Sequence, residues 1–152
     1  KWKYYKSIQD SQYYASEISG LVETSHRIWF HPPREGKYHN ITESMPFPEV
    51  NVSFIKNNKR INNGAFFIGL GWPDNLKGTY NRFCSYIGEE LYSTKLGDLP
   101  TTKIKLENIK RDDSTRFSSS YIYYNEKYGI VKMNGEGVNK DQFNLVLEKV
   151  ID

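Results

Sequence analysis

The side chains best suited to metal binding or proton transfer in this chain are its three histidines, His26, His31 and His39. Histidine is a common zinc ligand and a frequent general base near neutral pH. In an extended segment His26 and His31 point to opposite faces, so a shared metal would need a bend at Pro32 and a further ligand such as Glu43. A hydrolase that uses His31 or His39 with a carboxylate stays open as an alternative. The simpler interpretation is that the histidines are scattered over the surface.

Other motifs that carry chemistry in known proteins are incomplete in this chain. Glu89-Glu90 and Asp112-Asp113 are adjacent carboxylates, but neighbours on a strand point to opposite faces, so neither pair forms an acid–base couple by itself. Gly69-Leu70-Gly71 is followed by Trp72-Pro73, and therefore lacks the third glycine and the helix start of a dinucleotide-binding loop. The single cysteine, Cys84, excludes an intrachain disulfide and a Cys-rich zinc site, and we expect it to be a small buried apolar residue. The sequence predicts no catalytic residue, no metal and no cofactor.

Aromatic residues are the other group with binding potential, because 12 Tyr, 8 Phe and 3 Trp make up 15% of the chain. An aromatic ring offers a flat apolar face that can stack on a sugar or line a site for an apolar ligand. The competing interpretation is that most of these rings fill the core. The ligand-binding candidates are Trp29, Tyr38, Trp72, Tyr80 and Tyr86.

Length and composition favour one all-β domain over residues 1–152. A chain of 152 residues with 38% hydrophobic and 26% charged residues suits a folded core rather than a disordered tail. The net charge of +3 is small, and basic clusters such as Lys56, Lys59 and Arg60 are typical of charged edge strands. We therefore expect no nucleic-acid partner. No apolar run is long enough to span a bilayer.

The apolar pattern predicts β-strands. A period of two over Thr102–Glu107 and Gln142–Glu148 indicates strands with one buried face, and Tyr121–Met133 contains two β-rich runs around a turn. With turn signals every 8–12 residues or so, we expect about 8–10 short strands in a strongly curved antiparallel sheet, a partly closed barrel or a sandwich. The other expected strands are Tyr13–Ser19, Leu21–Phe30, Val50–Phe54, Ala65–Leu70, Thr79–Ile87 and Glu89–Thr94, with turns at Asn57–Gly64 and Gly88.

Four short segments carry a resemblance to a protein family. They are His31-Pro32-Pro33-Arg34, Met45-Pro46-Phe47-Pro48-Glu49, Ser93–Leu99 and Tyr123–Lys132. In this order they resemble uncharacterised secreted or lipid-anchored β-proteins of Bacteroidetes-type bacteria, over residues 26–150. The resemblance implies an antiparallel, curved or barrel-like sheet and an envelope location. It implies no established activity, so no catalytic residues are carried over.

These observations lead to a functional hypothesis. We expect a non-enzymatic protein of the bacterial cell envelope that binds an apolar or amphipathic ligand, or an envelope protein, on the concave face of its sheet. A carbohydrate-binding module that uses exposed Trp or Tyr is an alternative. The chain begins with Lys1 rather than Met, as expected of a processed secreted protein or of a trimmed chain. We expect a secreted, periplasmic or lipid-anchored location, with the signal segment outside this chain.

Overall fold

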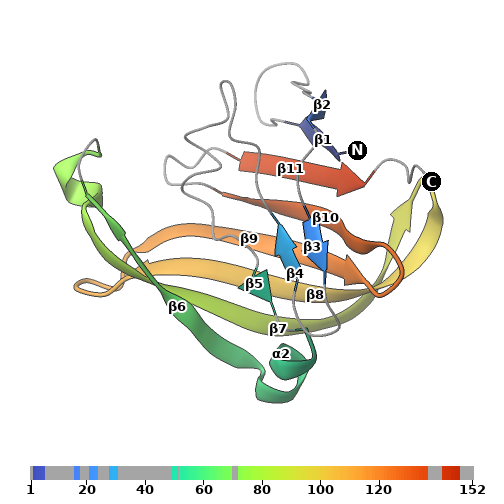
Figure 1. Cartoon of the computed structure of the whole chain (residues 1–152), viewed down its shortest axis with the longest axis horizontal. Helices are drawn as coiled ribbons and strands as arrows, with labels where there is room; N and C mark the ends of the chain where they lie inside the picture. Colours follow the sequence, from blue (N-terminus) through green and yellow to red (C-terminus); the bar gives the residue numbers. More distant parts are fainter. Residues whose placement is uncertain are drawn as a thin grey trace.

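The structure is a computed structural model. It describes residues 2–5, 16–17, 21–23, 28–30, 49–50, 52–69, 72–136 and 142–147, with the backbone alone for residues 2–50, Ser53 and Phe143. Its main feature is an eight-stranded antiparallel sheet in the order β2-β1-β11-β10-β9-β8-β7-β6 (Figure 1). These strands are β1 (Trp2–Tyr5), β2 (Ser16–Glu17), β6 (Arg60–Ile68), β7 (Gly78–Thr94), β8 (Gly97–Lys110), β9 (Arg116–Asn125), β10 (Gly129–Glu136) and β11 (Gln142–Leu147).

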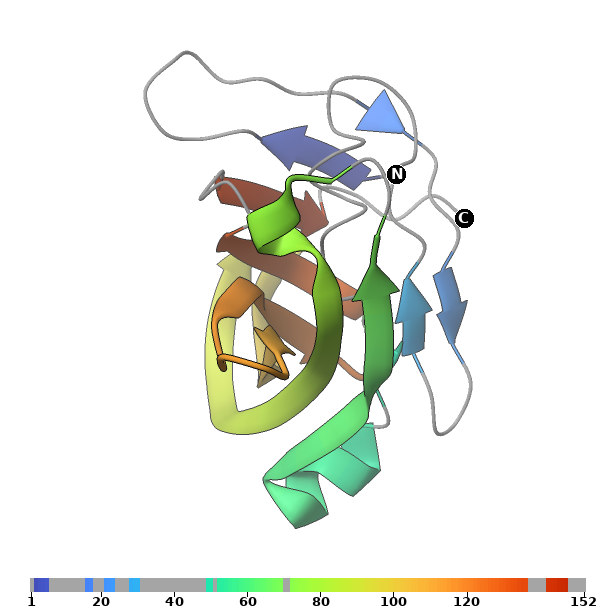
Figure 2. The ribbon, with the colours of Figure 1, turned by 90° about the vertical axis from the view of Figure 1, so that its left-hand side faces the viewer.

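The strands from β6 to β11 pair in chain order, each antiparallel to the next. Strand β1 then adds to the far side of β11, so that β2 and β6 form the two edges. The long strands β7 and β8 bend strongly, and the sheet curves without closing (Figures 1 and 2). The predicted all-β class with a curved antiparallel sheet is confirmed.

A second, three-stranded sheet contains β3 (Leu21–Glu23), β4 (Ile28–Phe30) and β5 (Glu49–Val50). It lies on the open side of the large curved sheet (Figures 1 and 2). The prediction of one strand over Leu21–Phe30 is wrong, because Leu21 pairs with Phe30 and the two ends form a hairpin. Both ends are rich in β-forming residues, and a period of two does not reveal a chain reversal between them.

The prediction of a strand over Val50–Phe54 is also wrong in its second half, where helix α2 (Val52–Asn58) begins. The alternation of Val52 and Phe54 fits a strand, but Val52 and Ile55 have the i, i+3 spacing of a helix face. The structure follows that helical spacing, since Ile55 is fully buried in the main core and Val52 packs against it.

Two glycine positions that the sequence predicts to be turns lie inside strands. Asn63-Gly64 forms a bulge in β6, where Gly64 has a φ of 99° and the register shifts between Asn62 and Ala65. Glycine suits such a left-handed position in a bulge as well as in a hairpin turn, so the dipeptide alone does not distinguish the two. Gly88 likewise marks a bulge within one strand of 17 residues, β7, and does not separate two strands.

Burial follows the predicted period of two, with one change of phase. On β8, Ile104, Leu106 and Asn108 are buried, while Lys103, Lys105 and Glu107, which alternate with them, are partly exposed. Before Thr102 the pattern reverses, because Leu99 and Thr101 are buried and Pro100 is exposed. The reversal lies beside the bulge in β7, where Gly88 pairs with Lys103. The buried side chains of β8 therefore lie on one face of the sheet from Ile104 onward and on the other face at Leu99 and Thr101.

The core lies mainly on one face of β7–β11, which we call the inner face. Cross-strand pairs place Cys84, Leu106, Ile122, Met133 and Leu145 on it, and all of them are buried. The helix α2 contributes Ile55 to the same cluster.

Candidate functional site

One end of the inner face carries an aromatic cluster, formed by Phe66, Trp72, Tyr80 and Phe117. The Tyr80 ring stacks on Phe66 with centroids 5.5 Å apart and lies 4.7 Å from Phe117. The Trp72 ring meets Phe117 edge-on at 6.0 Å. Tyr80 is only 2% exposed, and its hydroxyl donates a hydrogen bond of 2.7 Å to the Leu76 carbonyl in the turn η2 (Asp74–Leu76). Burial raises the pKa of Tyr80, and the nearby Asp113 carboxylate adds to the effect.

The aromatic cluster brings together some of the predicted ligand-binding residues and separates others. Trp72 and Tyr80 both contact Phe117, whereas Tyr86 lies further along β7 beside Glu89. The backbone of Trp29 belongs to β4, but its side chain lies outside the described residues, as does the whole of Tyr38. The structure therefore supports a shared location only for Trp72 and Tyr80.

A group of polar residues interrupts the apolar inner face beside the aromatic cluster. This polar patch consists of Arg82, Asn108, Ser118 and Ser120, from β7, β8 and β9. Arg82 pairs with Asn108 across the strands and Asn108 pairs with Ser118, while Ser120 lies two residues further along the same face. On β9 the patch falls between Phe117 of the aromatic cluster and Ile122 of the aliphatic core. Polar groups are thus flanked by apolar surface on both sides.

Three members of the polar patch are deeply buried, since Asn108, Ser118 and Ser120 are exposed by 1%, 3% and 0%, while Arg82 is partly exposed. The Asn108 amide donates a hydrogen bond of 3.0 Å to the Ser118 hydroxyl. The Ser120 hydroxyl is completely enclosed but has no hydrogen-bond partner among the described residues. A buried hydroxyl without a partner costs free energy, so its presence needs an explanation.

Arg82 brings a positive charge to this patch. Its guanidinium carbon lies 4.8 Å from the centroid of the Phe66 ring, a cation–π contact with the aromatic cluster. The same charge acts on Cys84: burial raises the pKa of this thiol to about 12, and the Arg82 charge opposes the rise. Cys84 is buried, which confirms the expectation for this residue, and a raised pKa disfavours the reactive thiolate.

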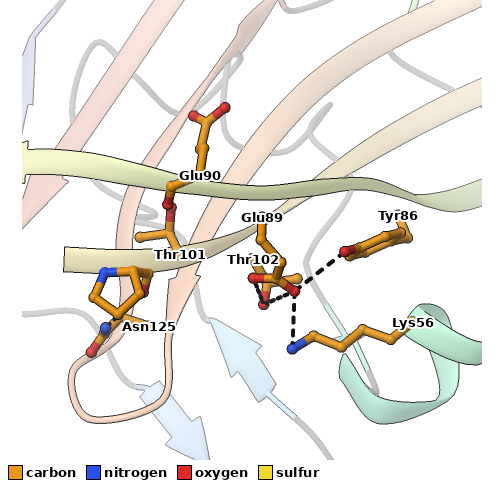
Figure 3. Close-up of polar contacts among 8 residues, drawn as sticks. Lys56, Tyr86, Glu89, Glu90, Thr101, Thr102 and Asn125 are labelled. Atoms are coloured by element: carbon orange, nitrogen blue, oxygen red, sulfur yellow. Dashed lines mark hydrogen bonds and ion pairs between the residues drawn. The ribbon is translucent and has the colours of Figure 1, made fainter.

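A second polar group surrounds Glu89 at the bend of β7 (Figure 3). The Glu89 carboxylate accepts hydrogen bonds of 3.0 and 3.2 Å from the Thr102 hydroxyl and one of 3.4 Å from the Tyr86 hydroxyl. Lys56 of α2 forms an ion pair of 3.1 Å with the same carboxylate. This network ties α2 to the sheet, and its charges balance within the group.

Glu89 and Glu90 leave β7 in opposite directions, as expected of neighbours on a strand (Figure 3). Glu90 forms an ion pair of 3.3 Å with Lys103 on the other face of the sheet. The adjacent carboxylates therefore serve two separate ion pairs and do not form an acid–base couple.

The predicted histidine alternative involves His26, His31 and His39, which all lie outside the described residues. Within the described ranges, no three His, Cys, Asp or Glu side chains come together as a metal site. No helix in the described part of the chain combines the length and apolar character needed to cross a bilayer.

Sequence reasoning missed the polar patch. Asn108, Ser118 and Ser120 look like ordinary solvent-facing residues in a strand-rich sequence. A signal existed, however, because Asn108 continues the period-two series of Ile104 and Leu106, and residues two apart on a strand share a face.

No family model, curated protein or solved structure matches this chain.

Proposed function

We propose that this chain is a non-catalytic binding protein of the bacterial cell envelope, and that its inner face takes an amphipathic ligand. The apolar part of the ligand lies against the aromatic cluster and the neighbouring aliphatic residues. The polar head of the ligand meets the polar patch of Arg82, Asn108, Ser118 and Ser120.

The observation that carries this proposal is the enclosed polar patch between two apolar regions. Ligand sites are typically apolar surfaces with a few convergent polar groups that fix orientation. The Ser120 hydroxyl is fully buried and has no partner in the described part of the chain, and an alanine at this position would avoid its desolvation cost. A ligand whose head group displaces the residues that cover Ser120 would give this hydroxyl a hydrogen-bond partner, which would explain why it is there.

Charge decides which head group fits best. The positively charged member of the patch is Arg82, held against the Phe66 ring at one end of it. Guanidinium groups bind carboxylates and phosphates with hydrogen bonds that are stronger than neutral ones. An anionic head group on an apolar tail is therefore the preferred ligand class. The envelope location rests on the resemblance of the four sequence segments.

Decanoate tests this proposal, because it joins a carboxylate to a flexible apolar tail. We expect saturable binding by isothermal titration calorimetry below the micelle concentration, and weaker binding of decanol, which lacks the charge. Arg82→Gln should weaken decanoate binding by about tenfold to a hundredfold, since one charge-assisted hydrogen bond contributes about 1.5–3 kcal/mol. The matched control is Arg116→Gln, which removes an exposed arginine from β9 of the same sheet.

The outcome that contradicts the proposal is equally clear. Decanoate binding that is absent, or that is the same in the wild type and in Arg82→Gln, would rule out head-group recognition by the polar patch. Circular dichroism and urea unfolding of both variants show whether each one is folded before its affinity is compared.

A further inference from the structure

The face of the sheet that does not carry the polar patch is the outer face. On it, two lysines lie on either side of one tyrosine ring. Lys103 on β8 and Lys132 on β10 are both cross-strand partners of Tyr123 on β9. Their ammonium nitrogens lie 4.9 and 5.1 Å from the centroid of the Tyr123 ring. We call Lys103, Tyr123 and Lys132 the lysine–tyrosine row.

The two lysines differ in their partners. Lys103 has an ion pair of 3.3 Å with Glu90. Lys132 instead lies over a second ring, with its nitrogen 4.8 Å from the centroid of Tyr92, which itself contacts Tyr123. Among the described residues no carboxylate lies within ion-pair distance of Lys132.

The electrostatics of the two lysines differ accordingly. A hydrogen bond with Tyr123, opposed in part by burial, and the nearby Glu90 raise the pKa of Lys103. Burial lowers the pKa of Lys132, the positive charge of Lys103 lowers it further, and Glu90 offsets only part of this. Lys132 is thus a partly buried cation beside a like charge, and an added negative charge at this point would relieve the repulsion.

We propose that Lys132, supported by Lys103, forms a binding site for an oxyanion on the outer face of the sheet, and that its ligand is a phosphate group. The three donors of the ammonium group suit a phosphate held at a single point. The rings of Tyr92 and Tyr123 enclose one side of the ammonium group and reduce its screening by water, which strengthens its attraction to an anion. The phosphate group can belong to a soluble molecule or to a lipid head group.

This site is independent of the proposed function, because it uses the opposite face and none of the residues of the polar patch. Arg82→Gln should leave phosphate binding unchanged, and Lys132→Gln should leave decanoate binding unchanged. A failure of either proposal is therefore separate from a failure of the other.

The test uses two probes, inorganic phosphate and vesicles of phosphatidylglycerol, with phosphatidylcholine vesicles as the uncharged comparison. We expect the Lys132 side-chain ammonium resonance to shift on addition of the binding probe, with a saturable response. Lys132→Gln should weaken binding about tenfold or more, and Lys132→Arg should retain most of it. The matched control is Lys105→Gln, because Lys105 is on the same face but already pairs with Glu107 at 2.7 Å.

Each outcome decides the question. A response to inorganic phosphate identifies a soluble phosphate as sufficient, and a response to phosphatidylglycerol alone identifies the lipid head group. If neither probe shifts the Lys132 resonance, or if Lys132→Gln binds as tightly as the wild type, the proposal is overturned. The resonance is measured on the wild-type chain, so the test does not depend on the folding of a variant.

Discussion

Two serines on neighbouring positions of the inner face should respond oppositely to the same substitution. Ser120→Ala removes a hydroxyl that is 0% exposed and has no hydrogen-bond partner within the described ranges. Removing such a group recovers a desolvation cost of about 1–3 kcal/mol, less a few tenths for the small void that one missing oxygen leaves. We expect Ser120→Ala to raise the free energy of unfolding by about 1 kcal/mol.

Ser118→Ala is the matched control, because Ser118 is equally buried but accepts a hydrogen bond of 3.0 Å from the Asn108 amide. Its loss should lower the free energy of unfolding by about 1–2 kcal/mol. Urea unfolding with both tyrosine fluorescence and circular dichroism measures the two values, provided that the slope with urea stays constant. If Ser120→Ala destabilises the chain as much as Ser118→Ala does, the Ser120 hydroxyl has a stabilising partner and our reasoning is refuted. If Ser120→Ala instead gains stability and loses decanoate affinity, the hydroxyl serves the ligand.

Three further predictions concern packing, thiol chemistry and charge. Gly135→Ala should destabilise the chain by about 2 kcal/mol or more in urea unfolding, because an added Cβ would meet backbone atoms of Ser119 and Ser120 on β9 well inside contact distance. Cys84, with a pKa of about 12, should not react with Ellman's reagent at pH 8 in the folded chain and should react fully in urea; rapid reaction without urea would contradict its burial. Lys132→Met should raise the free energy of unfolding at pH 7, because a lowered folded-state pKa means that folding disfavours the charged form, and the gain should shrink as the pH rises toward 10.5. Lys103→Met should lower the free energy of unfolding at pH 7, since the stabilisation that accompanies a raised pKa is complete below the ordinary lysine pKa of 10.5 and is lost as the pH rises through the folded-state pKa. If both substitutions change the free energy of unfolding in the same direction, the like-charge argument fails.

The strands could be predicted where one face of the sheet is buried in the core and the other is exposed to solvent. Thr102–Glu107 shows this most clearly, since Ile104 and Leu106 are buried and the adjacent Lys103 and Lys105 are partly exposed. A period of two arises directly from this one-sided burial, so the sequence carries the information. The same logic predicted the all-β class and the antiparallel sheet.

Features that depend on more distant contacts could not be predicted in this way. Val52 and Phe54 fit a strand locally, and only the burial of Ile55 against the sheet favours the helix α2. The Asn63-Gly64 dipeptide suits a bulge as well as a turn, and the pairing of β6 with β7 decides between them. The polar patch is hidden for a similar reason, because local sequence does not state which serine or asparagine the curved sheet will enclose.

The bulge at Gly88 determines which side chains in the second half of β7 lie on the inner face and which lie on the outer face. Before it, Tyr86 pairs with Ile104; after it, Tyr92 pairs with Leu99, so the register is shifted by one residue. Without that shift Leu91 would take the place opposite Leu99, and Tyr92 would point to the other face. The observed register leaves Leu91 74% exposed and brings Tyr92 to Lys132 on the outer face.

The same register shift also decides which partners Glu89 and Glu90 contact. Glu89 comes to lie opposite Thr102, where it binds α2 through Lys56, and Glu90 comes to lie opposite Thr101, within reach of Lys103. In a regular strand Glu89 would instead lie opposite Thr101, on the outer face. The ion pairs of Glu89 with Lys56 of α2 and of Glu90 with Lys103 would then both be lost. One additional residue in β7 therefore positions Glu89 to hold α2 on the inner side. On the outer face it leaves Lys103 and Lys132 with a single carboxylate, Glu90, among the described residues. The unbalanced charge at Lys132 is thus a consequence of strand register, which is why it is visible in the structure and not in the sequence.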